Sequence, residues 1–172
     1  MSDKLHIVPP SHPAFSKQIE QFEFDGSTDP KELTDKMIDM MQKAGAAGLA
    51  ANQLGLEHRV FVLNTKPDPI VCFNPRIVHY SEKFAVVEEG CLTFPGLFVK
   101  IRRPRWIRVR FQEVDGSMRT ETLDGLAARA FQHELDHLDG VNYLSKAKKI
   151  HLDQARRKQK LIDRKLKRLQ LA

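Results

Sequence analysis

The sequence predicts an α+β fold, with antiparallel β-sheets packed around a central helix, an N-terminal helix and a basic C-terminal helix. Apolar residues recur at helical spacing near both ends of the chain and in residues 124–138, whereas the region between residues 60 and 123 has strand-like runs. These runs follow one another without intervening helices, which favours antiparallel pairing. A chain of 172 residues is sufficient for one core. We therefore expect one main domain over 1–145, with residues 146–172 as a basic helix packed on it.

The N-terminal region predicts one helix. Pro9, Pro10 and Pro13 argue against helix in residues 1–15. The segment Ser27-Thr28-Asp29-Pro30 offers a capping side chain followed by proline in the first turn, so a helix is expected over about 30–44. Its methionines are interpreted as core filler.

Short apolar runs predict the strands. They lie at residues 60–63, 70–73, 84–87 and 107–111. Asp115-Gly116 predicts a hairpin turn before a further strand from Met118 to Leu123. In the run at 107–111, apolar residues alternate with arginines, so one face of that strand is expected to contact water.

The second helix, over about 124–138, carries the chemistry. Asp124 can cap its start and Gly140 can end it. The segment His-Glu-Leu-Asp-His at 133–137 places His133 and His137 four residues apart, on one face, where both can bind one ion. Glu134 is left free of the metal to transfer protons. Because the helix is apolar over most of its surface, these polar groups need a compensating partner, which a metal supplies.

Three kinds of metalloenzyme site compete for this helix. A thermolysin-like site needs a glutamate ligand downstream, but no Glu follows residue 134. A metzincin-like site needs a third histidine where the chain has Tyr143. The remaining candidate is Cys91, in Glu-Glu-Gly-Cys-Leu-Thr; two imidazoles and a thiolate leave a fourth tetrahedral position for water.

Charge is concentrated at the C-terminus. Residues 145–172 contain 11 basic and 2 acidic residues, a net charge of +9, whereas the rest of the chain has a net charge of −3. A helix is expected over about 147–170, with Ile162, Leu166 and Leu169 as a narrow apolar stripe. Either this stripe packs on the body and the charges are solvated, or the helix contacts RNA or an acidic surface.

The composition indicates a cytoplasmic protein. Two cysteines are too few for a disulfide framework, and Cys72, in an apolar run, is expected to be a buried thiol with no disulfide partner. No stretch approaches the ~18 apolar residues of a membrane span. The N-terminus has neither a secretory nor a transit signature.

Three segments together resemble the peptide deformylase family. They are Gly48-Leu-Ala-Ala-Asn-Gln53, Glu89-Gly-Cys-Leu92 and Gln132-His-Glu-Leu-Asp-His-Leu-Asp-Gly140, in the family's order and at its separations. The resemblance spans about 45–140, and the first forty residues match the family poorly. It implies hydrolysis of the formyl group of N-formylmethionine on nascent polypeptides, with release of formate. It also implies Fe²⁺ in the cell, with Zn²⁺, Ni²⁺ or Co²⁺ as substitutes in preparations.

The resemblance also implies residue roles. Cys91, His133 and His137 would hold the metal, which lowers the pKa of a bound water so that hydroxide attacks the formyl carbon. Glu134 would act as general base and then acid. The Gln53 amide and the Leu92 backbone N–H would stabilise the oxyanion. The substrate-binding residues would be Ala47, Gly48, Glu89, Gly90, Leu126 and Ala130, with the peptide lying against the backbone like an added strand.

The chain departs from the family's usual sequence at two positions. Ala46 replaces a glycine, which could narrow the cleft, and Ala47 is shorter than the usual apolar residue, which could loosen a side-chain pocket. Arg103, in an Arg-Pro pair typical of the family, is expected to be partly buried against Glu89. Some relatives have a basic C-terminal helix that docks on the ribosome near the tunnel exit, and the same contact is expected here.

Two other functions are weighed against a deformylase. One is a different metallohydrolase, such as an aminopeptidase. The other is a degenerate deformylase retained as a ribosome-binding module, against which the intact Cys91, His133, Glu134 and His137 argue.

Overall fold

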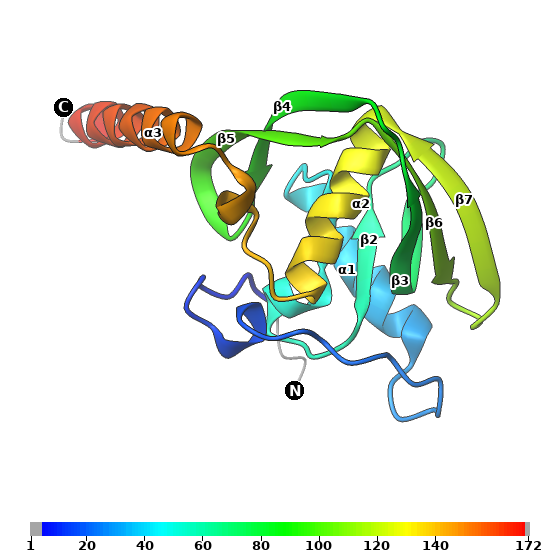
Figure 1. The fold of residues 1–172 in the computed structure, drawn as a ribbon. Coiled ribbons are helices and arrows are strands. Elements are labelled where there is room, and N and C mark those ends of the chain that lie inside the picture. Colours follow the sequence, from blue (N-terminus) through cyan, green and yellow to red (C-terminus); the bar gives the residue numbers. More distant parts are fainter. Residues whose placement is uncertain (1–4, 171–172) are drawn as a thin grey trace.

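The computed structural model describes residues 5–170, and the side chains of residues 5–167 (Figure 1). Its helices and strands occur in the following order: α1 (Pro30–Lys43), β1 (Gly48–Ala50), β2 (Val60–Leu63), β3 (Ile70–Tyr80), β4 (Phe84–Cys91), β5 (Phe94–Pro104), β6 (Trp106–Gln112), β7 (Met118–Asp124), α2 (Gly125–Leu138) and α3 (Lys149–Gln170). Single 3-10 turns lie at Pro13–Phe15, Ala51–Leu54 and Tyr143–Lys146. The predicted α+β class is confirmed.

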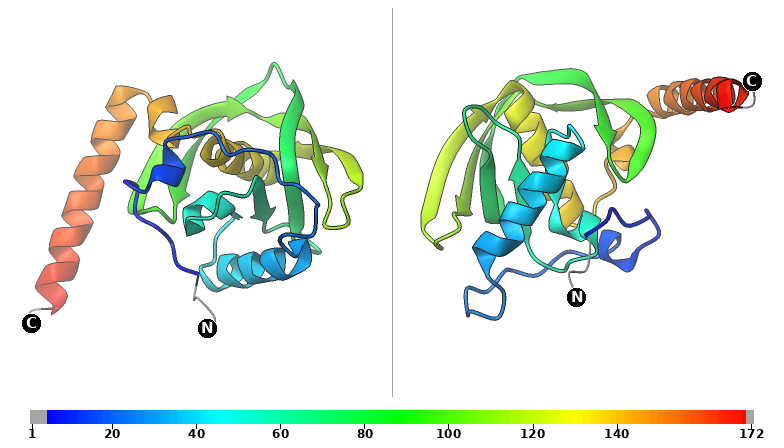
Figure 2. Two further views of the ribbon diagram at one scale, coloured as in Figure 1. Left: turned by 90° about the horizontal axis from the view of Figure 1, so that it is seen from below. Right: turned by 180° about the vertical axis from the view of Figure 1, so that it is seen from behind.

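Two antiparallel sheets surround α2 (Figures 1 and 2). The larger sheet has the strand order β1-β2-β3-β6-β7, and the smaller is the hairpin β4-β5. The buried face of the large sheet packs on the apolar side of α2, where Phe61 and Phe131 meet edge to face with ring centroids 4.9 Å apart. Because α2 lies between the two sheets, side chains on its different faces can meet both.

The central helix begins and ends as its capping residues predict. Asp124 is the N-cap and accepts a hydrogen bond from the Gly125 N–H. Every residue from 128 to 138 is buried. Gly140 has φ +69°, and a Cβ there would lie 2.8 Å from the backbone of Lys17, so a side chain at this position would displace the N-terminal segment.

Strand β5 and the short strand β1 were not predicted from the sequence. Along β5, Leu97, Val99 and Ile101 are buried and alternate with exposed neighbours, as in any half-buried strand. The next inward position holds Arg103, which interrupts the apolar pattern. Strand β1 has only three residues, too few for a period to be recognised. The predicted strands 70–73 and 84–87 extend to Tyr80 and Cys91.

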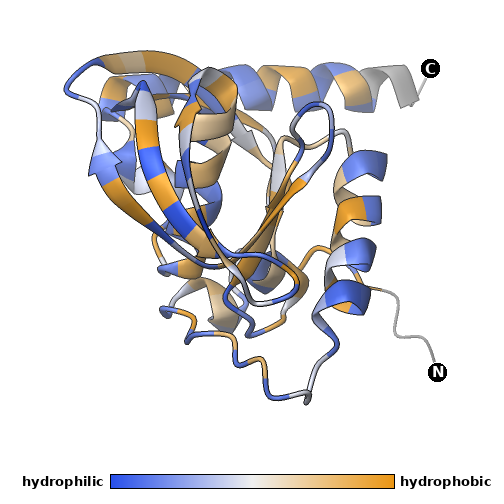
Figure 3. Cartoon of the chain, turned by 90° about the vertical axis from the view of Figure 1, so that its right-hand side faces the viewer, coloured by the Kyte–Doolittle hydropathy of each residue, from blue (hydrophilic) through white to orange (hydrophobic). Residues whose placement is uncertain are grey.

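Helix α1 packs on β1 and β2 on the side away from α2, and apolar residues recur among polar ones along it (Figure 3). Asp29 caps its start, with Pro30 in the first turn, as predicted. Met37 and Met41 are fully buried, so they fill the core as expected. Ala46 follows this helix with a negative φ, so its methyl group causes no backbone strain.

Helix α3 projects away from the body beyond its first turns (Figures 1 and 2). Leu152 and Ala155 pack with Leu97 and Ile101 of β5. Farther along, Ile162 is 45% exposed and Leu166 is 53% exposed, so this part of the predicted apolar stripe does not pack on the body. The side chain of Leu169 lies outside the described residues. Between residues 5 and 170, no helix is both long and apolar enough to cross a bilayer.

Candidate metal centre and cleft

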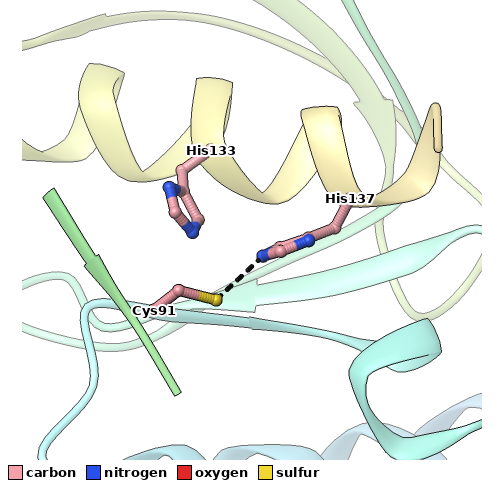
Figure 4. A group of neighbouring side chains, drawn as sticks. All are labelled: Cys91, His133 and His137. Carbon is pink, nitrogen blue, oxygen red and sulfur yellow. Dashed lines mark hydrogen bonds between the residues drawn. The ribbon is translucent and has the colours of Figure 1, made fainter. Parts of the chain in front are cut away.

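Cys91, His133 and His137 converge on one point (Figure 4). Cys91 lies at the end of β4, and the two histidines lie one turn apart on α2. The Cys91 Sγ is 3.2 Å from the His137 Nε2, and one ligand atom from each of the three residues lies within 4.8 Å of the others. Ligands at about 2.0–2.3 Å from a tetrahedral ion lie about 3.3–3.8 Å apart, so the 3.2 Å pair is already at this spacing and the third atom needs only a small side-chain shift. The arrangement therefore fits one metal ion.

A buried carboxylate orients one of the two imidazoles. The Glu89 Oε2 is 3.0 Å from the His133 Nδ1, which leaves the His133 Nε2 for the metal. Burial alone would raise the pKa of Glu89, but hydrogen bonds with His133 and Arg103 outweigh it and hold this pKa at about 2. Glu89 is therefore a permanent anion beside the candidate metal ligands.

Two arginines hold Glu89 in turn. Arg103 donates to both Glu89 oxygens, at 2.6 and 2.8 Å, and Arg129 Nη1 donates to Oε1 at 2.5 Å. Asp136 accepts from Arg103 at 2.9 Å and from Lys146 at 2.5 Å. Arg103 is only 2% exposed, so the prediction that it contacts Glu89 is confirmed and its burial is more complete than expected. Breaking such a buried network by removing one partner is costly.

The sequence-based prediction omitted Arg129 and Asp136. A signal for Arg129 was available, because it lies four residues before His133 on a helix predicted to be buried, and a buried guanidinium needs an acceptor. Asp136 is part of the metal-binding segment, but its partner Arg103 is distant in sequence, and no local pattern indicates that pairing.

In the absence of a metal ion, the imidazoles of His133 and His137 differ in charge. Burial lowers the pKa of His137 well below its ordinary value, so that this ring is neutral. For His133, burial acts in the same direction, but hydrogen bonding to Cys91 and Glu89 outweighs it and raises the pKa to about 10. Metal binding must displace this proton, so the metal affinity of the site should rise with pH.

Glu134 lies beside the three ligands but makes a different set of contacts. It is 4% exposed, and its Oε2 has no hydrogen-bond partner among the described residues. Burial raises the pKa of Glu134 to about 7, and the charge of Glu89 adds to this effect, while the charge of His133 opposes it. A carboxyl group that titrates near neutral pH can both accept and return a proton.

Gly48 makes room for this carboxylate. A Cβ at Gly48 would lie 2.7 Å from the Glu134 Oε1 and 2.8 Å from its Cγ. Glu134 therefore packs directly on the Cα of Gly48. This contact explains why residue 48 has no side chain, independently of its place in the cleft.

Gln53 directs its side-chain amide at the centre. Its Oε1 accepts from the Ala50 backbone N–H at 2.9 Å, which fixes the orientation of the amide. Its Nε2 then lies 3.4 Å from the Cys91 Sγ and 3.3 Å from the Thr93 Oγ1. The N–H groups are thus presented to the space beside the sulfur, where an oxyanion donor would be needed.

A cavity of about 500 Å³ opens onto these groups. Of the twelve residues assigned to the site from sequence, eleven line it: Ala47, Gly48, Gln53, Glu89, Gly90, Cys91, Leu92, Leu126, Ala130, His133 and Glu134. His137 lies behind the cleft at 2% exposure, with the ring of Phe15 packed against it edge to face. Phe98, 57% exposed, also lines the cavity and was not foreseen.

The position of Tyr143 excludes a metzincin-like site. Its ring packs on His133 with centroids 4.9 Å apart, and its hydroxyl donates to the Leu97 carbonyl at 3.2 Å. Burial raises the pKa of this hydroxyl above its ordinary value. Tyr143 therefore packs against a candidate metal ligand and does not take the place of one.

Comparison with known proteins decides the family. Residues 4–153 match the Polypeptide deformylase family. The chain belongs to this family. Its resemblance to peptide deformylases therefore extends beyond the span of about 45–140 that the motifs indicated, and it includes the N-terminal segment that was expected to match poorly.

Individual deformylases agree with this assignment. The chain is 42% identical over 118 residues to a peptide deformylase of Thermotoga neapolitana, covering 69% of this chain and 72% of the relative. A plant peptide deformylase structure superposes with a TM-score of 0.85 at 31% identity, covering 98% and 94% of the two chains. A Met-Ala-Ser-bound deformylase of Acinetobacter baumannii gives a TM-score of 0.78 at 25% identity, covering 85% and 99%. The protein is a hydrolase of the deformylase family.

Proposed function

We propose that this deformylase hydrolyses the formyl group of N-formylmethionine on nascent polypeptides, using one divalent metal held by Cys91, His133 and His137. The observation that carries the proposal is the buried Glu134 carboxylate, with an unpartnered oxygen, beside three converging ligands. We expect Fe²⁺ in the cell, and Zn²⁺, Ni²⁺ or Co²⁺ in preparations, because this donor set accepts several metals. When bound, the metal supplies Lewis acidity and lowers the pKa of a water molecule to about 7.

Residues of the chain would supply proton transfer, oxyanion stabilisation and orientation of a metal ligand. Glu134 takes the proton from the attacking water and passes it to the leaving amine, for which a pKa near neutrality is suited. The Gln53 amide and the Leu92 backbone N–H donate to the oxygen on which negative charge develops. Glu89 holds the His133 ring at the angle that metal binding requires.

The peptide would occupy the cleft as an added strand. Gly48 in β1 and Gly90 in β4 line it from opposite sides, and neither has a side chain that would keep a peptide backbone away. The Met-Ala-Ser ligand of the Acinetobacter relative has the sequence of a deformylated product, which supports a short peptide as the ligand here.

The test is formate release from formyl-Met-Ala-Ser by protein purified without oxygen, with metal analysis of the same sample. Stoichiometric metal and formate production are expected. Release of free methionine from Met-Ala-Ser, without formate from the formylated peptide, would indicate an aminopeptidase instead. A protein that binds metal but releases neither product would be the degenerate module.

We also propose that α3 binds the ribosome near the tunnel exit and that the enzyme works in the cytoplasm, where formylated chains emerge. The support is the net charge of +9 over residues 145–172 and the projection of the helix from the body.

The packing of α3 on β5 shows where the helix can be shortened to test ribosome binding. Truncation after Lys160 removes the projecting half and leaves Leu152 and Ala155 in place on β5. Because residues 161–172 carry +3 of the net charge of +9, co-sedimentation with ribosomes should weaken, while formate release from the tripeptide should be retained. Unchanged sedimentation would refute the docking role, and loss of both functions would instead indicate that the truncation damaged the fold.

A further inference from the structure

The large sheet has an exposed surface on the side of β3, β6 and β7 that is turned away from α2 (Figure 1). Alternate residues of these strands, such as Val109 and Leu123, point inward and are buried with α2. Their neighbours point outward and are exposed: Arg76, Val78, Arg108, Arg110, Thr120 and Thr122. These six residues, together with His79 and Trp106, are called the outer face below.

The basic residues of the outer face lie opposite one another. In the strand register, Arg76 is directly opposite Arg110, and His79 is directly opposite Arg108. Residues paired in this way have Cβ atoms about 4.5–5.5 Å apart, and like charges at such positions repel. Among residues 5–167, no carboxylate forms an ion pair with any of the three arginines. Their charges are therefore left uncompensated by the protein.

The acidic residues that border this face are already engaged. Glu121 pairs with Arg119 at 2.8 Å, and Asp124 lies 3.6 Å from Arg105 and also caps α2. Residues 1–144 have a net charge of −3, so a cluster of unpaired cations here does not follow from the composition of the body. An anionic ligand on the outer face would relieve the repulsion between the opposed cations.

Aromatic surface lies beside these cations. The rings of His79 and Trp106 are stacked, with centroids 5.3 Å apart and planes inclined by 29°. They line a hollow of about 1010 Å³ whose other lining residues include Val78, Arg108, Thr120 and Thr122. Arginines that meet phosphates, with aromatic rings on which unstacked bases lie, are the combination that binds single-stranded nucleic acid. The threonine hydroxyls can in addition hydrogen-bond a ribose 2′-OH.

We propose that the outer face binds single-stranded RNA. Arg76, Arg108 and Arg110 contact phosphates, and a base stacks on the ring of Trp106. Arg108 and Arg110 are two residues apart on β6, so they are about 7 Å apart along the strand and can contact different phosphates. The surface is separated from the metal centre by the sheet itself, so the inference does not depend on deformylation. It is also a different contact from the one proposed for α3.

The fluorescence of Trp106 gives a direct assay. Trp106 is the only tryptophan in the chain, so its signal reports on the outer face and not on RNA bound to α3. Titration of the full chain with a short oligoadenylate at low salt should change this fluorescence to saturation. Three phosphate contacts predict a slope of about −2 for the logarithm of the binding constant against that of the salt concentration, and Arg110→Ala should make it shallower by about 0.7. An unchanged fluorescence, or the same slope in the variant, would overturn the proposal.

A charge reversal with a matched control tests the location. Arg110→Glu should weaken binding at least about tenfold, because it removes a phosphate contact and adds repulsion. Lys36→Glu makes the same change in charge on the exposed side of α1 and should weaken binding less than about twofold. Thermal unfolding should show both proteins folded, since both side chains are exposed. If both variants weaken binding equally, only the overall charge matters and the proposed site is wrong.

The class of ligand is tested with the same signal. Duplex RNA should bind more weakly because its bases are already stacked, and DNA of the same sequence should bind more weakly because it lacks the 2′-OH. Oligoglutamate should bind more weakly than either single strand because it has no bases to stack on Trp106. Binding of duplex RNA or DNA as tight as that of single-stranded RNA would overturn the assignment. Tighter binding of oligoglutamate would show a surface for an acidic protein instead.

Discussion

Substitution of Gly48 by alanine should lower the activity by displacing the Glu134 carboxylate, which packs against this glycine. The added Cβ would lie 2.7 Å from the Glu134 Oε1 and 2.8 Å from its Cγ, whereas ordinary contact begins at 3.4 Å. The carboxylate must therefore retreat by about 0.7 Å at its oxygen. Because Glu134 is 4% exposed and lines the cleft, the carboxylate would shift towards the cleft, away from the position that it holds beside the three candidate ligands.

The expected magnitude follows from the geometry of proton transfer. A displacement of about 1 Å in a reacting group can cost ~10²-fold in rate, so Gly48→Ala should lower kcat for formyl-Met-Ala-Ser by roughly 30- to 100-fold. The backbone at Gly48 does not have a positive φ, so alanine itself causes no backbone strain there. Thermal unfolding should therefore show a folded protein.

Gly90→Ala is the matched control, because it makes the same change in the same cleft, again without a positive φ. The Cβ there would meet the ring of Phe98 at 2.5 Å, but Phe98 is 57% exposed and can rotate away. A smaller fall in kcat is expected, and Phe98→Ala in the same chain should relieve it. If Gly48→Ala keeps kcat within about threefold while folding normally, or raises KM alone, the idea that this glycine positions the general base is wrong.

The remaining predictions concern the groups around the metal. Glu134→Gln should lower kcat by about 10²–10⁴-fold, and near-normal turnover would remove its role as general base. Gln53→Ala should cost about 10²–10³-fold if its amide serves the oxyanion, so a negligible change in kcat would rule that role out. Glu89→Gln should weaken metal binding about 10–100-fold in competition with a chelator, because His133 loses its orienting anion and Arg103 loses one of its two carboxylate partners; unchanged affinity would contradict this. In the metal-free protein, the lowered pKa of Glu89, about 2 against 4.5, contributes stability that is fully present above about pH 4.5 and is lost as pH falls towards 2. This contribution is about 3 kcal/mol, and urea unfolding of the wild type and Glu89→Gln should converge in stability over that range.

Local patterns in the sequence predict much of the fold. The start of α1 at Asp29-Pro30 and the capping of α2 by Asp124 depend on side chains within a few residues, so the sequence displays them directly. Strand β5 was missed because an inward position holds Arg103, a residue that only its pairing with Glu89 explains. That pairing joins residues 14 positions apart and belongs to the tertiary structure.

The candidate site divides in the same way. The spacing of His133 and His137 follows from helix geometry, so their convergence could be predicted. The expected burial of Arg129 indicates that its guanidinium needs an acceptor, but the sequence does not indicate that this acceptor is Glu89. The contact between Gly48 and Glu134 could not be predicted from the sequence. It joins two elements that are distant in the chain, β1 and α2, and it depends on residue 48 having no side chain.

One thiolate and two imidazoles are proposed to hold a single metal ion. X-ray absorption spectroscopy at the edge of the bound metal tests it most directly, on wild type and on Cys91→Ser. The account predicts one sulfur at about 2.3 Å together with nitrogen or oxygen neighbours at about 2.0–2.1 Å, and loss of the sulfur signal in the variant. A spectrum without sulfur in the wild-type protein, or one that persists unchanged after Cys91→Ser, would contradict it.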